Sequence, residues 1–223
     1  MIDSLALTSG IVWLALFFLI CGPIHECAHA FTAWRMGDGT AKLFGRISLD
    51  PIVHFDPVGG TLLAASVVLS IFSGGGGVGF GWAKPTPVNP YNLRGRHAQT
   101  WVAVAGPVSN LILAALFAVG FRVMWAQGYS VNNQSVPNLI TLVFFEGVYL
   151  NVILFIFNLL PIPPLDGSHV LLDQVSPRRS RDIGAFFDQY GLMLLIVIVL
   201  FAGRVISPFV NPILSLLLGV QVG

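Results

Sequence analysis

The chain has 223 residues, of which 55% are hydrophobic and only 9% are charged, and its mean hydropathy is +0.82. A soluble domain carries about 25% charged residues, so this composition indicates an integral membrane protein. The formal net charge of +1 and the lack of a basic stripe in the sequence exclude a nucleic-acid-binding protein. Cys21 and Cys27 lie six residues apart on different faces of one apolar helix, so we expect packing thiols and no disulfide.

The first apolar segment, Leu5–Ile24, runs for about twenty uncharged residues and ends at His25-Glu26-Cys27-Ala28-His29. We expect this helix to be retained, because the residues before it lack the positive region of a signal peptide. A charge at membrane depth costs roughly 2.5–3.5 kcal/mol and is a functional candidate by default. On a helix His25 and His29 share one face and can bind one metal, while Glu26 lies about 100° round, within reach of a water beside that metal.

The later elements alternate between apolar runs and short irregular stretches. Gly39–Asp50 and Val78–Val88 are predicted as short strands bounded by turn residues, and prolines within the second demote it to an edge strand. Val123–Phe145 is predicted as a polar loop followed by the approach to the next span. A glycine run, Gly74–Gly77, is a candidate hinge. The further predicted membrane segments are Pro57–Ala83, Ala98–Phe121, Gly147–Leu165 and Gln189–Gly203, while Val205–Gly223, which contains Pro208 and Pro212, is left open.

A zinc hydrolase usually holds its metal with three protein ligands and a water, so the two histidines need a partner. The candidates are His54, His97, His169, Asp50, Asp56, Glu146, Asp166 and Asp173. Asp166 stands out because it ends an apolar run in which Pro161, Pro163 and Pro164 stop the helix. Non-helical backbone at membrane depth has to be buried or line a cavity, so an acid there faces a site. The alternative is that Asp166 merely caps a helix.

Four motifs occur in a fixed order: HECAH, FGWAKPTPVNP (Phe80–Pro90), AGPVSN (Ala105–Asn110) and NLLPIPPLDG (Asn158–Gly167). Together they resemble the site-2 protease family of intramembrane zinc metalloproteases, and within it the compact prokaryotic branch that has no PDZ or CBS domain. The resemblance covers roughly residues 15–175.

The resemblance implies one zinc ion per chain, bound by His25, His29 and Asp166, with Glu26 as the catalytic base. It also implies that Asn158 lies close to the zinc, where we expect it to donate a hydrogen bond to the developing oxyanion. For AGPVSN we favour close helix packing as its main role. His54 and His169 are either outer partners of the site or ordinary loop histidines.

Chain topology limits how HECAH and Asp166 can meet. If all four runs before Asp166 crossed the membrane, the two motifs would end on opposite faces. We therefore expect Pro57–Ala83 to form a re-entrant hairpin that enters and leaves on one side. Nine of the 11 basic residues then fall on the face that bears both motifs, all except Arg122 and Arg204. The positive-inside rule makes that face cytoplasmic and the N-terminus external, in a multi-pass protein of the cell membrane.

The sequence thus predicts an all-α integral membrane protein with about five to six membrane segments, a re-entrant hairpin and short β-strands at the cytoplasmic rim. It forms a single domain over residues 1–223, with a core of roughly 5–175 and C-terminal helices in 183–223.

The predicted function is hydrolysis of peptide bonds in transmembrane segments of substrate proteins, which is regulated intramembrane proteolysis. The predicted partners are those substrates and the lipid bilayer, and strand addition along Val78–Val88 would hold an unwound substrate. One alternative is a non-proteolytic metal-binding membrane protein that captures partner helices, although such a protein has no use for Glu26. A metal transporter is a third possibility, but it would need polar residues along several spans.

Overall fold

The computed structural model describes residues 3–74, 79–132 and 134–221, and within them the side chains of Ala202, Gly203 and Val205 are left undescribed. This part of the chain contains helices and no strand. In order, the elements are α1 (Ser4–Leu16), the π-helical turn η1 (Phe17–Cys21), α2 (Gly22–Arg35), α3 (Thr40–Leu43), α4 (Pro51–His54), α5 (Pro57–Phe72), the 3₁₀ turn η2 (Pro90–Asn92), α6 (Ala98–Ala126), α7 (Val136–Asn158), α8 (Asp166–Gln174), α9 (Pro177–Leu200) and α10 (Ala202–Leu218).

Four helices are long and apolar enough to cross a membrane: Ser4–Arg35, Ala98–Ala126, Val136–Asn158 and Pro177–Leu200. The apolar helices Pro57–Phe72 and Ile206–Leu218 are shorter. The chain is therefore a multi-pass membrane protein whose described part contains four candidate spans.

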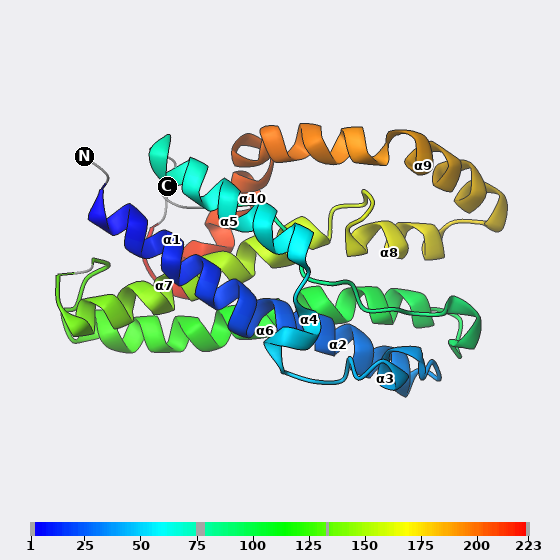
Figure 1. The fold of residues 1–223 in the computed structure, drawn as a ribbon, viewed down its shortest axis with the longest axis horizontal. Helices are drawn as coiled ribbons and strands as arrows, with labels where there is room; N and C mark the ends of the chain where they lie inside the picture. Colours follow the sequence, from blue (N-terminus) through cyan, green and yellow to red (C-terminus); the bar gives the residue numbers. More distant parts are fainter. Residues whose placement is uncertain (1–2, 75–78, 133, 222–223) are drawn as a thin grey trace.

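The first span is one continuous helix of 32 residues, formed by α1, η1 and α2 and drawn in blue in Figure 1. Its π turn lies immediately before the HECAH segment, and the Gly22 N–H donates to the Phe17 carbonyl five residues back. A π turn inserts one extra residue and so rotates everything that follows around the helix axis. The turn therefore helps to set the direction in which His25 and His29 point.

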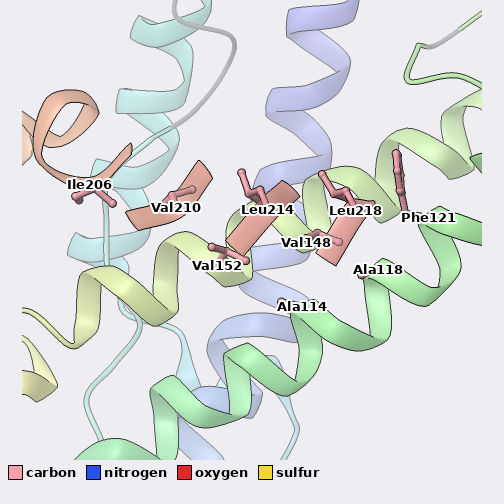
Figure 2. Close-up of a cluster of buried hydrophobic side chains, with 9 residues drawn as sticks. All are labelled: Ala114, Ala118, Phe121, Val148, Val152, Ile206, Val210, Leu214 and Leu218. Atoms are coloured by element: carbon pink, nitrogen blue, oxygen red, sulfur yellow. The ribbon is translucent and has the colours of Figure 1, made fainter. Parts of the chain in front are cut away.

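Helices α6 and α7 form the centre of the bundle, and small residues let them approach closely. Ala114 and Ala118 of α6 are buried against α7. The last helix, α10, covers this pair with a stripe of apolar side chains four residues apart, as Figure 2 shows. The stripe consists of Ile206, Val210, Leu214 and Leu218. Pro208 and Pro212 also lie inside α10, at positions outside this stripe.

The segment between α2 and α6 leaves and returns at the same place. The Arg94 N–H donates to the Met36 carbonyl at 2.7 Å. The Asp38 carboxylate accepts from the Asn89 N–H at 2.7 Å and from the Asn92 amide at 3.1 Å. Residues 37–94 are therefore closed at their base, beside the end of α2.

Within this closed segment the chain forms a hairpin. Helix α5 packs along α1, so closely that a Cβ added at Gly10 would lie 2.8 Å from Ile71. The chain then runs back along α5, because Gly79 lies against Val67 and Gly81 against Leu63. Both glycines are required here, since an added Cβ would come within 2.5 Å of those side chains. The return continues towards α2, and Figure 1 shows α5 in cyan beside α1.

Two sequence predictions are wrong in detail. Gly39–Asp50 is not a strand: the Asp38 carboxylate accepts the Thr40 N–H and folds a turn into α3, which Gly45 ends at a φ of +69°. Residues 79–88 are extended but form no strand ladder, and Val78 and Gly75–Gly77 of the candidate hinge lie outside the described residues.

The third span begins at Val136 and not at Gly147. Ser135 is its N-cap and accepts the Asn138 N–H, while Pro137 occupies the first turn, where proline is favoured. Residues that we interpreted as loop signals are therefore the start of a helix.

Candidate active site

Two histidines and one aspartate converge at the end of the first span. His25 Nε2 lies 3.0 Å from His29 Nε2 and 3.2 Å from Asp166 Oδ2. His29 Nε2 lies 3.3 Å from the same carboxylate oxygen. Ligands on a tetrahedral zinc at about 2.0–2.1 Å lie about 3.3 Å from one another, so the three atoms fit the ligand triangle of one zinc ion. The three residues that the sequence singled out are thus brought together.

Hydrogen bonds at the Nδ1 atoms fix the orientation and the tautomer of the two imidazole rings. His29 Nδ1 lies 2.7 Å from the Val102 carbonyl oxygen, which can only accept, so Nδ1 carries the hydrogen. His25 Nδ1 lies 2.6 Å from the Asn110 Oδ1 atom and is assigned the same tautomer. Both Nε2 atoms of the neutral rings then offer lone pairs to the same point, where Asp166 Oδ2 is buried without a hydrogen-bond donor. Such convergent acceptors repel one another unless a cation lies among them, so the donor set fits zinc.

Asp166 is the first residue of α8, yet its side chain caps no helix. The capping interpretation of this residue is therefore wrong. The helix start is set close to the preceding turn, since a Cβ added at Gly167 would lie 2.3 Å from the Leu159 carbonyl oxygen. Because Gly167 has no side chain, α8 can begin close to this turn, at the position from which the Asp166 carboxylate reaches the two histidines.

Helix α6 lies directly against the imidazoles at Gly106. A Cβ at this position would lie 2.3 Å from His29 Nε2 and 2.6 Å from His25 Nε2. The AGPVSN motif does pack helices together, as the sequence favoured. At Gly106, α6 packs directly on the imidazole rings of the two candidate ligands.

A buried polar chain supports His25 from behind. The Asn110 amide donates to Asn151 Oδ1 at 2.9 Å, and the Asn151 amide donates to the Gly147 carbonyl at 2.8 Å and to Cys21 Sγ at 3.2 Å. Both asparagines are fully buried. Sequence reasoning missed Asn151, although an amide inside an apolar span is a recognisable signal. Cys21 and Cys27 are free thiols, as expected.

Glu26 faces the extended return segment. Its Oε2 atom accepts the Thr86 N–H at 2.8 Å, and its main-chain carbonyl accepts the Thr86 hydroxyl at 2.9 Å. No feature of the sequence pairs these residues, which lie sixty positions apart. The predicted base is thus adjacent in sequence to a candidate ligand and fixed in space by a distant loop.

The remaining predicted residues bond to partners outside the group of His25, His29 and Asp166. The Asn158 amide donates to the Leu154 carbonyl of its own helix at 2.9 Å, which leaves its second N–H available. His54 is buried and bonded through Nε2 to the Ser48 carbonyl at 2.8 Å. His169 is exposed, 3.4 Å from the Gln99 amide. His97 lies 3.4 Å from Asp173.

Comparisons with known proteins agree with this geometry. Residues 122–202 match the family model described as peptidase family M50. The protein named putative zinc metalloprotease YwhC of Bacillus subtilis is 38% identical over 189 residues, which are 83% of this chain and 79% of that protein. The chain belongs to peptidase family M50, the site-2 protease family.

Two mycobacterial relatives support this membership. The proteins named putative zinc metalloprotease Rip2 of Mycobacterium tuberculosis and Mycolicibacterium smegmatis are each 30% identical. The aligned residues cover 89% of this chain and 71% of the first protein, and 79% of this chain and 62% of the second. No solved structure matches the chain significantly. As a member of the M50 family, the protein is a membrane-embedded zinc metalloprotease whose cofactor is Zn²⁺.

Proposed function

We propose that this M50 peptidase cuts peptide bonds within transmembrane segments of other membrane proteins, as in regulated intramembrane proteolysis. The observation that carries the proposal is the position of the candidate ligands. His25 and His29 lie within the continuous apolar helix Ser4–Arg35, and the orphaned Asp166 carboxylate faces them. A metal centre on a membrane-spanning helix is placed to act on substrates that are themselves in the membrane.

In this proposal His25, His29 and Asp166 hold the zinc, which when bound would polarise the scissile carbonyl and acidify the attacking water. Glu26 takes a proton from that water and delivers it to the leaving amine. The second N–H of Asn158 stabilises the oxyanion, and its loss would lower kcat by about 100-fold. Asn110 and Val102 keep the lone pairs of the imidazoles turned towards the metal.

The topology we propose has both ends of the 37–94 segment on one side of the membrane. The closure between Met36 and Arg94 supports this arrangement. The hairpin of α5 and its return is then re-entrant, and the spans at α6 and α7 bring Asp166 back to the face of HECAH. By the positive-inside rule that face is cytoplasmic, in the cell membrane, and the N-terminus is external.

A substrate helix must unwind before its carbonyls can be attacked, and the extended residues 79–83 supply an edge for it. One side of this edge is occupied: Ser66 Oγ accepts the Phe80 N–H at 2.8 Å and donates to its carbonyl at 3.0 Å. Gly79, Phe80 and Gly81 of this segment also line a cavity of about 490 Å³, whose walls include Leu154 and Phe157 of α7. We propose that the unwound substrate lies there as an added strand, with apolar side chains in the cavity.

The decisive experiment gives the purified zinc-loaded protein in lipid nanodiscs a model transmembrane substrate. The Glu26→Gln variant should bind zinc normally and lose cleavage by at least about 1,000-fold, because general-base help and charge are both removed. Asp166→Ala should lose zinc. Cleavage by Glu26→Gln at the wild-type rate would refute the base, and full zinc affinity in Asp166→Ala would refute the third ligand.

Strand addition has a separate test. Substituting proline for Ala83 removes one N–H from the proposed edge and should raise KM for the transmembrane substrate with zinc affinity unchanged. An unchanged KM would count against this mode of binding.

A further inference from the structure

An extended segment, residues 79–89, lies across the active site, and we refer to it as the strap. Thr86 is the strap residue that contacts Glu26. It does so twice, through its N–H to the carboxylate at 2.8 Å and through its hydroxyl to the main-chain carbonyl at 2.9 Å. Two hydrogen bonds from Thr86 to Glu26 fix both the position and the direction of the strap at this point.

The composition of the strap makes Thr86 a pre-organised donor. Proline has no N–H, so within Pro85-Thr86-Pro87 the single backbone donor is that of Thr86, and it is committed to Glu26. The two rings also lock their own φ angles and restrict the residue before each of them. The donor therefore loses little conformational freedom when the hydrogen bond forms.

The strap is tied down on both sides of Thr86. The Lys84 N–H donates to the His54 carbonyl at 2.8 Å, and the Asn89 N–H donates to Asp38 at 2.7 Å. These anchors belong to the segment between α2 and α5. Thr86 is consequently held from two directions, and neither anchor involves Glu26.

Arg46 supports the strap from beneath, with only 5% of its surface exposed. Its guanidinium donates to the Val53 carbonyl at 2.7 Å and, at a longer 3.4 Å, to the carbonyls of Lys84 and Pro85. No carboxylate within residues 3–74, 79–132 and 134–221 forms an ion pair with Arg46. A buried guanidinium that binds only carbonyls is costly. Two of its three carbonyl partners belong to Lys84 and Pro85, the residues that precede Thr86.

We propose that Thr86 is a positioning residue for Glu26 and that Arg46 positions Thr86. The Thr86 N–H holds one carboxylate oxygen, Oε2, so that Oε1 is directed to the attacking water. This inference rests on the proposed function, because it takes Glu26 as the base. A displacement of about 1 Å at a reacting group can cost 100-fold in rate, which is the size of effect that such an orienting bond can control.

Hydrogen exchange tests the contact without measuring activity. In a peptide covering 82–88, the two prolines carry no amide hydrogen and the first two residues lose their label during analysis, so the positions that report are Lys84, Thr86 and Val88. In Glu26→Ala one of these should exchange about ten-fold faster or more, as expected for loss of a bond to a charged acceptor. Glu26→Gln keeps an acceptor and should change much less. Equal protection of this peptide in wild type and Glu26→Ala would overturn the contact.

Kinetics test the role. Thr86→Pro removes the N–H and should lower kcat by about 100-fold, with KM for the model transmembrane substrate and zinc affinity each within about two-fold of wild type. Thr86→Val keeps the N–H and should lose only about three-fold, the cost of the hydroxyl bond. Val88→Pro is the matched control, since it adds a proline to the strap without removing a donor from Glu26, and it should lose less than Thr86→Pro by at least about ten-fold.

Arg46→Met supplies a second route if Thr86→Pro does not fold. It should lower kcat by about ten-fold and accelerate exchange in the 82–88 peptide. Zinc affinity should be retained, because the hydrogen bonds of Arg46 go to Val53, Lys84 and Pro85 and to none of the candidate ligands. Wild-type kcat in both Thr86→Pro and Arg46→Met would overturn the inference, and so would a raised kcat, since Thr86 would then restrain the base. If Glu26→Gln cleaved at the wild-type rate, the assignment of Glu26 as the base would fail instead, and if the wild type did not cleave the transmembrane substrate, the proposed function would fail, so these failures are distinguishable.

Discussion

Gly106 offers the sharpest test of how the metal centre is built. The alanine variant adds a single methyl group to α6. That Cβ would lie 2.3 Å from His29 Nε2 and 2.6 Å from His25 Nε2. Non-bonded heavy atoms settle at about 3.5–4.0 Å, so the imidazoles or the helix must move by about 1 Å.

The size of the effect follows from what such a shift disrupts. Turning the rings breaks their hydrogen bonds of 2.6 Å to Asn110 and 2.7 Å to Val102. Loss of one outer partner typically lowers metal affinity 10–100-fold, and here the ligands themselves are displaced. We expect zinc affinity to fall by at least about 100-fold, equivalent to about 2.8 kcal/mol at 1.4 kcal/mol per tenfold change.

Zinc affinity is measured by competition with a chromophoric chelator in detergent, together with thermal unfolding of the metal-free protein. Gly120→Ala is the matched control on the same helix. Its Cβ would lie 2.4 Å from the Phe144 ring, and its nearest contacts include no candidate ligand. Both variants should be destabilised by overpacking, by roughly 1–3 kcal/mol. Only Gly106→Ala should lose zinc. Wild-type zinc affinity in Gly106→Ala, or equal losses of affinity in both variants, would refute the conclusion that Gly106 packs on the zinc ligands.

Three further predictions concern the supports of the fold. Asn110→Ala should lower zinc affinity by about 10–100-fold in the same competition assay, since His25 Nδ1 loses its 2.6 Å partner. Burial raises the pKa of Asp38, but hydrogen bonds from Thr40, Asn89 and Asn92 together outweigh burial and hold that pKa below its usual value. A carboxylate whose pKa is lower in the folded state stabilises the fold at pH values above its unfolded-state pKa of about 3.9. This stabilisation is lost as the pH falls through its folded-state pKa. Asp38→Asn should therefore unfold more easily than wild type at pH 7, and the gap should narrow as the pH falls below the unfolded value, as followed by thermal unfolding across pH. The Arg122 guanidinium donates to the last carbonyls of α10, at 2.7 Å for Leu217. Arg122→Met should lower the unfolding free energy by about 1–2 kcal/mol without affecting zinc, and an unchanged melting temperature would contradict this.

Errors in the sequence-based fold prediction share one cause. The sequence predicts a span from Gly147, but the helix already begins at Val136, where Ser135 is its N-cap. At Gly39–Asp50 the pattern favoured a strand, but the Asp38 carboxylate bonds the Thr40 N–H and turns the chain into α3. In both places a side-chain cap decided the local backbone, and caps act on one or two bonds that residue periodicity does not reveal.

The sequence by itself determined which residues form the candidate metal centre. The separation of four between His25 and His29 fixes their common helix face. If Asp166 shares a metal with the histidines, one of the four apolar runs before it has to turn back, and the closure of residues 37–94 is consistent with this requirement. These conclusions follow from helix geometry and chain parity, which are local or topological.

Only the tertiary structure decided what surrounds that centre. Gly106 against the imidazoles, Asn110 on His25 and Thr86 on Glu26 are contacts between residues sixty or more positions apart. Their hydrogen bonds depend on how the helices and the strap pack against α2, to within a few tenths of an ångström. No periodicity along the chain encodes such distances, because they arise from the close packing of elements that the sequence specifies separately.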